Sequence, residues 1–485
     1  MKHIHFIGIC GVAMSALAIA FSKNNWRVTG SDVGFYPPVS TNLKKNNIKF
    51  YPGWHEDKMC SMGIPDLVVV GNVASSTNPE WLFVKNNKIN HCSYPEAVAK
   101  YIVKKNSIVC AGTYGKTTTS AIMSWILKCA NFNPSYMFGG LANNENFEPA
   151  FFSCENHTSF KGKNIPASNY DSDINDDMAG TKKWSVLEGD EYKTARWDNS
   201  PKFNHYSPTH LLLTSIVWDH MDVYPTEESY LKAFKQLISM IPKDGLAVVS
   251  ENVTALENEQ FKCQLIKYGQ TNADYIYSVL SHAKDGLEVK ITCKNEQTII
   301  KSKMLGRFNA ENIVACYAMA REINIPSKTI INALNGFLGI KRRLQKRSIS
   351  EPTVFDDIAH SPAKAAFTLN ALRDAYKQSR IFAVFEPNTG NRQQQSAFGY
   401  DNAFKNADEV IIPRLTKIKT DKNAENEALN GLDLKSIISK THSNCRYIDE
   451  DSELLHYLKS NAKKDDIIVF LGSHGFRSMI EELTT

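Results

Sequence analysis

Short apolar runs alternate with longer segments of helical periodicity through the first hundred residues. The runs 4–7, 26–29 and 67–70 have the length and composition of buried strands. The segments between them are long enough for helices, and this alternation is typical of a parallel sheet with helices on its faces. We therefore predict a Rossmann-like α/β domain over residues 1–106.

The same alternation starts again twice further along the chain. A strand at 107–111 runs into a glycine turn and a helix at 117–129, and further helices are predicted at 227–240 and 309–322. From residue 342 the pattern predicts buried strands and helices at 353–355, 363–376, 381–385, 409–412, 451–460 and 467–471. We predict an α/β fold of three domains, in which a central P-loop ATPase-like domain with a parallel sheet (107–341) precedes a second Rossmann-like domain (342–485).

A polar stretch interrupts the central domain. Residues 142–181 are rich in Asn, Asp, Ser and Lys and show almost no apolar period. We interpret them as a long surface excursion.

The apolar N-terminal segment 4–21 allows two interpretations. It follows Lys2 and ends in Ala18-Ile19-Ala20, so that it superficially resembles a signal peptide. Gly8 and Gly11 interrupt it, however, and a second strand follows at the distance that a βαβ unit requires. Strand, turn and helix is the better interpretation.

Composition narrows the class of protein. A chain of 485 residues with 42% hydrophobic and 22% charged residues is typical of a soluble globular protein of several domains. The net charge of 56 − 51 = +5 is scattered along the chain, which argues against a nucleic-acid partner. The ten cysteines form no CxxC pair, and no run approaches a membrane span. We expect a cytoplasmic protein without a membrane span, and the pattern implies no particular oligomeric state.

The sharpest chemical signal is a glycine turn between the strand at 107–111 and the helix that follows. It reads Gly112-Thr113-Tyr114-Gly115-Lys116-Thr117-Thr118. Glycines let backbone N–H groups converge on phosphate oxygens, and the helix N-terminus adds positive potential. Lys116 can neutralise phosphate charge and the Thr117 hydroxyl can reach Mg²⁺. The turn therefore predicts a phosphate-binding loop, although its GxxGKT spacing is shorter than the common GxxxxGKT.

A second glycine turn lies near the N-terminus. Gly8 and Gly11 flank Cys10, but the sequence departs from the GxGxxG dinucleotide pattern. Asp32 follows the second strand, where a carboxylate in a nucleotide-binding βαβ unit bonds a ribose or base. We expect a nucleotide group here, and the residues alone leave its identity open.

Two acidic patches follow predicted strands and are candidates for a metal site. One is Glu188-Gly189-Asp190-Glu191, and the other is Asp219-His220-Met221-Asp222. Mg²⁺ prefers oxygen ligands and keeps several waters, so one carboxylate with the Thr117 hydroxyl would be enough. Solvated loop charge is the alternative interpretation of each patch.

These motifs, taken in order, resemble the Mur ligases of bacterial cell-wall synthesis. The matching segments are GTYGKTTT, EGDE, WDHMD, GRFNAEN, KRRLQ and DDIAHSP, and the resemblance covers nearly the whole chain. Within the family, GICGVAM with GSD and the residues 200–206 look most like members that join L-alanyl-γ-D-glutamyl-meso-diaminopimelate to UDP-N-acetylmuramate. The resemblance implies ATP-dependent ligation through an acyl phosphate, in peptidoglycan recycling.

The resemblance also implies roles for individual residues. UDP-N-acetylmuramate would be held by Gly8, Cys10, Gly11, Asp32 and Ser75. ATP would be held by the loop from Gly112 to Thr118 and by Asn309, Asn312, Arg343 and Asp356. Mg²⁺ would be surrounded by Thr117, Glu188 and His220, and the residues expected to act in catalysis are Lys116, His220 and Arg343.

Two alternatives stay open beside this interpretation. Tyr114, Phe308 and Ser361 stand where these ligases usually carry His. One alternative is a ligase that adds L-alanine to UDP-N-acetylmuramate in de novo synthesis. The other, from a different class, is a non-catalytic nucleotide-binding regulator.

Overall fold

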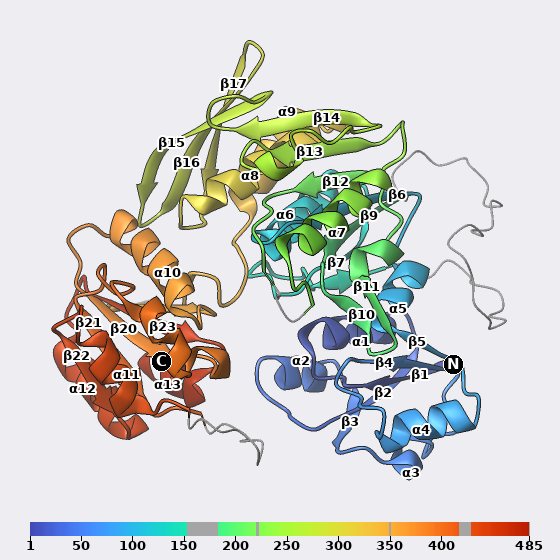
Figure 1. Cartoon of the computed structure of the whole chain (residues 1–485), viewed down its shortest axis with the longest axis horizontal. Helices are drawn as coiled ribbons and strands as arrows, with labels where there is room; N and C mark the ends of the chain where they lie inside the picture. The colour runs from blue at the N-terminus through green and yellow to red at the C-terminus, as the bar shows by residue number, and fades with distance from the viewer. Residues whose placement is uncertain (153–182, 220–222, 349–350, 417–427, 485) are drawn as a thin grey trace. The chain divides into compact units, whose positions relative to one another are not determined.

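The chain folds into two compact units, as the computed structural model in Figure 1 shows. The structure describes residues 1–152, 183–219, 223–348, 351–416 and 428–484. The first unit comprises Met1–Ser278, Lys290–Ile300 and Ala310–Phe337, and the second comprises Val279–Val289, Lys301–Asn309 and Leu338–Thr485. The predicted limits of the three domains stay a prediction.

The first unit begins with a five-stranded parallel sheet in the order β3-β2-β1-β4-β5. Its strands are β1 (His3–Ile7), β2 (Arg27–Asp32), β3 (Lys49–Pro52), β4 (Leu67–Val70) and β5 (His91–Ser93). Its helices are α1 (Val12–Lys23), α2 (Val39–Lys45), α3 (Glu56–Met59), α4 (Pro79–Asn86) and α5 (Tyr94–Tyr101). The strands predicted at 4–7, 26–29 and 67–70 are confirmed, and the second runs on to Asp32.

Both faces of this sheet are buried, because helices cover each of them. Phe6 and Val69 pack on the side of α1 and α5, whereas Val68 and Val70 pack on the side of α3 and α4. Successive strand residues point to opposite faces, so continuous apolar runs are what a sheet covered on both sides requires.

The second sheet contains ten strands in the order β17-β16-β15-β14-β13-β12-β6-β9-β7-β8. All neighbours from β14 to β7 are parallel, and β8 is antiparallel to β7. The strands are β6 (Asn106–Ala111), β7 (Ser135–Met137), β8 (Ala150–Phe151), β9 (Trp184–Gly189), β12 (His210–Leu213), β13 (Leu246–Ser250), β14 (Gln264–Gly269), β15 (Tyr275–Ala283), β16 (Gly286–Cys293) and β17 (Glu296–Ser302).

This part of the chain also contains four α-helices and a hairpin among its described residues. The helices are α6 (Lys116–Cys129), α7 (Glu227–Ser239), α8 (Phe308–Glu322) and α9 (Ser327–Gly336). The hairpin pairs β10 (Lys193–Ala195) with β11 (Asp198–Pro201), and a short 3₁₀ helix, Lys202–His205, follows it. The strand predicted at 107–111 and the helices predicted at 117–129, 227–240 and 309–322 are confirmed.

The predicted surface excursion at 142–181 is wrong in its first part. Phe147, Ala150 and Phe152 are buried, and the Phe152 ring meets Phe21 of α1 edge to face at 5.0 Å. Three apolar residues spread through a polar stretch give no period that a sequence scan can detect, yet they pack into the core. The rest of the excursion, 153–182, lies outside the described residues.

The second unit is built on a six-stranded sheet in the order β18-β19-β23-β20-β21-β22, parallel except for β18. Its strands are β18 (Gln345–Lys346), β19 (Thr353–Asp357), β20 (Ile381–Glu386), β21 (Glu409–Pro413), β22 (Cys445–Ile448) and β23 (Ile467–Gly472). Its helices are α10 (Pro362–Ala375), α11 (Gly431–Ile438), α12 (Asp451–Asn461) and α13 (Met479–Thr484). Helices α10 and α11 cover one face of this sheet, and α12 and α13 cover the other. The strands and helices predicted from residue 342 onward are confirmed. No helix in the described part of the chain is long and apolar enough to cross a membrane.

A buried carboxylate joins three strands of the first sheet to α4. Glu80 Oε2 accepts a hydrogen bond from Ser31 Oγ (2.5 Å), and Oε1 accepts from Tyr51 OH (2.6 Å) and His55 N (2.9 Å). His5 Nε2 lies 3.6 Å from Oε2. Burial raises the pKa of Glu80, but the hydrogen bonds and the charge of His5 outweigh it and lower the pKa overall.

Replacing Glu80 by Ala leaves these buried donors without an acceptor. We expect the free energy of unfolding at pH 7 to fall by about 3–5 kcal/mol, measured by urea denaturation. Because the pKa of Glu80 is lowered in the folded protein, its contribution is present at neutral pH and is lost as the pH falls. The control is Glu148→Ala, which removes a partly exposed pair with Lys23 and should cost less than about 1 kcal/mol. Equal losses for the two variants would contradict the assignment.

Candidate active site

The predicted phosphate loop connects the end of β6 to the start of α6. Gly112 has a φ of +131° and Gly115 a φ of +84°, which are conformations that side chains other than glycine rarely adopt. A Cβ at Gly112 would overlap the Thr214 hydroxyl, and one at Gly115 would lie 2.6 Å from Asn312 Oδ1. The glycines are therefore needed both for backbone shape and for the close approach of neighbouring chain.

The segment that follows β12 holds the loop in place. Ser215 accepts hydrogen bonds from Thr113 N at its carbonyl (3.0 Å) and from Tyr114 N at its hydroxyl (3.0 Å). Thr113 Oγ1 donates to Val217 O (2.8 Å) and lies 3.0 Å from Tyr230 OH. The loop is thus fixed to a neighbouring strand end rather than to its own helix alone.

Lys116 stands in the first turn of α6, close to a buried carboxylate. Its Nζ donates to Gly112 O (2.7 Å) and lies 2.9 Å from Glu191 Oε2. The Glu191 side chain is fully buried and that of Lys116 is 11% exposed. Their attraction keeps the ammonium group beside the loop, where it can meet phosphate oxygens.

A hydroxyl and a carboxylate meet beside the same turn. Thr117 Oγ1 donates to Glu188 Oε1 (2.7 Å), and Gly139 N donates to Glu188 Oε2 (2.5 Å). Burial, and then the charge of Asp190, raise the pKa of Glu188. A cation here would offset this concentration of negative charge, and the oxygen donors are those that Mg²⁺ prefers. The residues present therefore fit a magnesium site.

The third expected metal ligand, His220, lies outside the described residues, as do Met221 and Asp222. Within the described ranges, no group of three His, Cys, Asp or Glu side chains is arranged to hold a metal ion. Thr117 and Glu188 would thus be the described part of a magnesium site.

The N-terminal glycine turn and Asp32 lie together at one edge of the first sheet. Gly8 N and Ile9 N donate to Ser31 O (2.9 and 3.1 Å), and Cys10 N donates to Asp32 Oδ2 (2.8 Å). Gly11 N closes the turn on Gly8 O (3.3 Å). The turn is shaped around one carboxylate at the carboxyl end of β2, the edge of a parallel sheet where ligands bind.

Ser75 belongs to the loop after β4, next to this turn. A Cβ on Gly8 would lie 2.5 Å from Val73, so the loop packs on the glycine turn. Ser75 Oγ lies 3.0 Å from Thr77 Oγ1. Its predicted role stays a prediction.

In the second unit, Asp356 is buried between two arginines. Arg342 Nε donates to Asp356 Oδ1 (3.2 Å) and Arg347 Nη1 donates to Oδ2 (3.0 Å). Arg342 also donates to the carbonyls of Gly472, Ser473 and His474. Burial raises the pKa of Asp356, although the two arginines oppose the shift. Arg342 is therefore an internal anchor of this unit, although it stands in a run of three basic residues, Lys341 to Arg343.

Arg343 and Asn309, both expected to bind ATP, also lie in the second unit. The Arg343 side chain is exposed, and its positive charge opposes the burial that raises the pKa of Asp357. Asn309 Nδ2 donates to Leu305 O (2.7 Å). Asn312, by contrast, lies in the first unit against Gly115.

The three departures from the family pattern have different surroundings. Tyr114 is 57% exposed on the phosphate loop, and Phe308 is 47% exposed at the start of α8. Ser361 caps α10, because its hydroxyl accepts from Lys364 N. Ser361 therefore has a structural role that explains its residue type.

Sequence reasoning missed Thr214, Ser215 and the part that Glu191 plays. From the sequence, Glu191 is only one member of an acidic patch. Thr214 and Ser215 follow the buried strand β12 directly, and strand ends are where sites of α/β sheets lie. Their position could have indicated a role at the phosphate loop only if β12 were already known to lie beside β6.

Family profiles match three successive parts of the chain. Residues 3–105 match the Mur ligase family catalytic domain, 110–320 match the Mur ligase middle domain, and 342–474 match the Mur ligase glutamate ligase domain. Their order agrees with the α/β fold of three domains predicted from the sequence.

Individual relatives are of two kinds. The chain is 30% identical to the UDP-N-acetylmuramate–L-alanyl-γ-D-glutamyl-meso-2,6-diaminoheptandioate ligase of Escherichia coli over 394 residues, 79% of this chain and 78% of that protein. It is 26% identical to the UDP-N-acetylmuramate–L-alanine ligase of Clostridium acetobutylicum over 478 residues, 97% and 95% of the two chains.

A solved structure has the same fold. The murein peptide ligase of Psychrobacter arcticus matches 100% of this chain and 98% of its own with a TM-score of 0.69 and 24% identity. Together with the phosphate loop and the matched profiles, these similarities establish that the chain belongs to the Mur ligase family of ATP-dependent ligases of peptidoglycan synthesis.

Proposed function

We propose that this enzyme joins L-alanyl-γ-D-glutamyl-meso-diaminopimelate to UDP-N-acetylmuramate, with ATP as the source of energy. The observation that carries the proposal is the arrangement at the phosphate loop, where Lys116, Thr117 and Glu188 converge. It suits transfer of a phosphoryl group, which depends mainly on positioning and on stabilising charge.

The proposed reaction has two steps. A carboxylate oxygen of UDP-N-acetylmuramate attacks the γ-phosphorus of ATP, the bond to the bridging oxygen breaks, and ADP leaves. The peptide amine then attacks the acyl carbon, an amide forms, and phosphate leaves with the former carboxylate oxygen and the electron pair of the broken C–O bond. The amine loses its proton to solvent or to a base.

The first step brings two anions together, so cationic groups must offset their repulsion. Lys116 is held at the loop by Glu191 and by the Gly112 carbonyl, and ATP phosphates would replace part of this contact. The N–H groups at the start of α6 add positive potential. Mg²⁺, held by Thr117 and Glu188, would supply further positive charge at the phosphates.

UDP-N-acetylmuramate is assigned to the N-terminal sheet. Gly8, Cys10 and Gly11 form a turn at the carboxyl end of β1, in which Gly8 is buried, Cys10 is half-buried and Gly11 is exposed. Asp32 fixes the turn by accepting from Cys10 N, and α1 begins directly after the turn, at the sheet edge, without a side-chain cap. A helix N-terminus that follows a glycine turn suits a nucleotide diphosphate.

The choice of the tripeptide rests on similarity to the E. coli enzyme and on residues 200–206. This segment contains the end of β11 and the 3₁₀ helix. Lys202 Nζ lies 3.0 Å from Asp190 Oδ2, and His205 Nε2 lies 3.1 Å from Asp198 Oδ2. L-Alanine is the second candidate, because the alanine ligase of C. acetobutylicum aligns over 97% of this chain.

Lys116→Ala tests the phosphate loop. Loss of the ammonium group should lower kcat for amine-dependent ADP formation by about 10²–10³-fold. The reason is that a positioned cation no longer stabilises the negative charge on the phosphoryl group during its transfer. Steady-state ADP release measures the effect, and a thermal melt checks folding. Lys128→Ala, at the far end of the same helix, should keep near-normal turnover. ADP formation by Lys116→Ala at the wild-type rate would refute the assignment.

Glu188→Gln tests the magnesium site. The substitution keeps the shape of the side chain but removes its charge, so the free Mg²⁺ concentration for half-maximal velocity should rise about 10-fold or more. Velocity at saturating ATP is measured against free Mg²⁺. The exposed Asp244→Asn serves as a control of equal charge change. An unaltered Mg²⁺ dependence in Glu188→Gln would remove this residue from the site.

An amine-swap assay tests the substrate. With UDP-N-acetylmuramate and ATP present, phosphate release is followed with either the tripeptide or L-alanine, and we expect kcat/KM to favour the tripeptide by about 100-fold. Preference for L-alanine would reassign the amine. Nucleotide binding without amine-dependent ADP release would instead indicate a regulator.

A further inference from the structure

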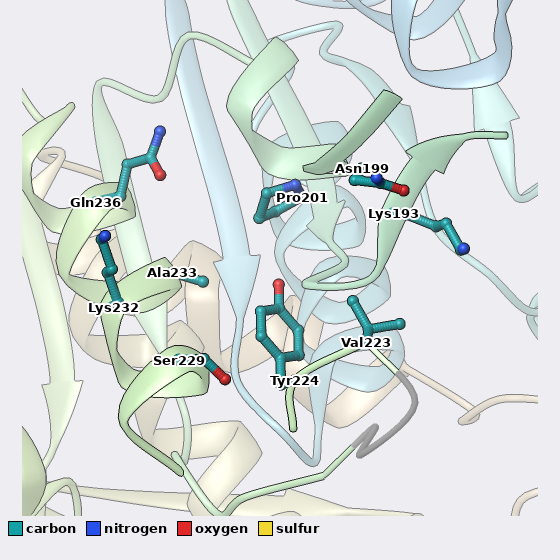
Figure 2. A pocket seen from close by; sticks show the side chains of 9 residues that line it. All are labelled: Lys193, Asn199, Pro201, Val223, Tyr224, Ser229, Lys232, Ala233 and Gln236. Carbon is teal, nitrogen blue, oxygen red and sulfur yellow. The ribbon is translucent and has the colours of Figure 1, made fainter. Parts of the chain in front are cut away.

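Two further features of the described residues are a pocket in the first unit and a cluster of polar side chains in the second. The pocket, of about 400 Å³, lies between the β10–β11 hairpin and α7. Figure 2 shows that its two lysines, Lys193 and Lys232, lie at opposite ends, so they do not form a common site for an anion. The cluster in the second unit is more closely built, because one carboxylate joins its members.

That carboxylate belongs to Asp374, near the end of α10. Its Oδ2 atom lies 2.8 Å from His282 Nδ1 of β15 and accepts a hydrogen bond from Arg307 Nε (2.5 Å). Arg307 stands in the loop between β17 and α8. The hydrogen bond from Arg307 lowers the pKa of Asp374 more than burial raises it, and the hydrogen bond with His282 lowers it further. Asp374 is therefore ionised at neutral pH and holds both partners.

Hydrogen bonds at both ring nitrogens determine the tautomer of His282. Nε2 accepts from the backbone N–H of Gly306 (3.0 Å), so the ring proton is assigned to Nδ1, which donates to Asp374 Oδ2. The His282 side chain is fully buried. By holding the proton on Nδ1, Asp374 keeps Nε2 as the acceptor for the backbone of the loop.

The loop held in this way leads directly into the Asn309 side chain. Gly306 has a φ of +90°, and a Cβ there would lie 2.4 Å from the Phe308 ring. Leu305 packs into the apolar core on the α10 face of the six-stranded sheet. Asn309 N closes the turn on Gly306 O (2.8 Å), and Asn309 Nδ2 donates to Leu305 O (2.7 Å). The position of the buried Asn309 carboxamide therefore depends on how this loop is anchored.

We propose that Asp374 and His282 are positioning residues for nucleotide recognition, which hold this loop so that Asn309 can hydrogen-bond the adenine of ATP. The inference rests on the proposed function and on the ATP-binding role expected for Asn309. Asp374 acts through His282 and Arg307, and His282 acts through the backbone of Gly306. All of these residues belong to the second unit.

Recognition of the base depends on this anchoring more than binding of the triphosphate does. Adenine carries an amino group at the ring position where guanine carries a carbonyl oxygen, so a fixed carboxamide can distinguish the two. The phosphate loop, Gly112 to Thr118, belongs to the first unit and has its own support at Ser215. A loop that loses its anchors should therefore lose preference for adenine while the phosphates are still bound.

The test compares ATP with GTP, which carry the same triphosphate and differ in the base. Release of ADP or GDP by the full chain is measured with UDP-N-acetylmuramate and the tripeptide saturating. Asp374→Ala should raise KM for ATP about tenfold and leave kcat and KM for GTP within about twofold of wild type. The matched control is Asp408→Ala, which removes the partner of Arg373 on the same helix and should leave the preference for ATP unchanged.

Two substitutions of His282 separate its two hydrogen bonds. His282→Gln places an acceptor near the position of Nε2, whereas His282→Asn keeps a donor near Nδ1 and leaves Gly306 N without its acceptor. We expect KM for ATP to stay within about twofold of wild type in His282→Gln and to rise about tenfold in His282→Asn, with thermal melts as a check of folding.

Three results would overturn the inference: a wild-type enzyme that does not prefer ATP to GTP, an Asp374→Ala variant in which KM rises equally for both nucleotides or for neither, and equal KM values for ATP in the two His282 variants. Wild-type enzyme that releases no ADP with either the tripeptide or L-alanine refutes the proposed function itself, a result that is seen without any variant.

Discussion

The site depends on the contact between the phosphate loop and the chain that leaves β12. Gly112 has no side chain where Thr214 approaches, and Ser215 accepts hydrogen bonds from both Thr113 N and Tyr114 N. These residues are about one hundred positions apart in the sequence and meet because β6 and β12 are neighbours in the sheet. A loop without this support would lack a fixed direction for its N–H groups and for Lys116. The order of the strands is therefore a requirement of the chemistry as well as of the fold.

Two buried carboxylates lie in the same small region, and each is compensated in a different way. Buried Glu191 holds Lys116, and Glu188 is surrounded by Thr117 and Gly139 with Asp190 nearby. A buried carboxylate is costly unless a cation or hydrogen-bond donors compensate it. One carboxylate already has its lysine, and the other accepts only neutral donors. This asymmetry makes Glu188 the natural place for a divalent cation and leaves Lys116 to face the phosphates.

Much of this arrangement was predictable from the sequence. The remaining features could not be predicted, for physical reasons that the structure identifies. The buried strands and the two glycine turns between strand and helix follow from local patterns, because strand, turn and helix are consecutive along the chain. The roles of Ser215 and Glu191 depend on which strands are neighbours, which local patterns do not contain. Arg342 stands in a run of three basic residues, which is typical of solvated charge, yet its side chain bonds Asp356 and three carbonyls near the C-terminus. Phe147 and Phe152 are core residues hidden in a polar stretch.

The central claim is that a carboxylate is activated by phosphorylation before the amine attacks it. The most direct test uses UDP-N-acetylmuramate labelled with ¹⁸O in its lactyl carboxylate, together with ATP and the tripeptide, followed by mass analysis of the released phosphate. The account predicts that each turnover transfers one oxygen from the carboxylate to phosphate, because the acyl C–O bond breaks when the amide forms. Phosphate released without the label during product formation would contradict it.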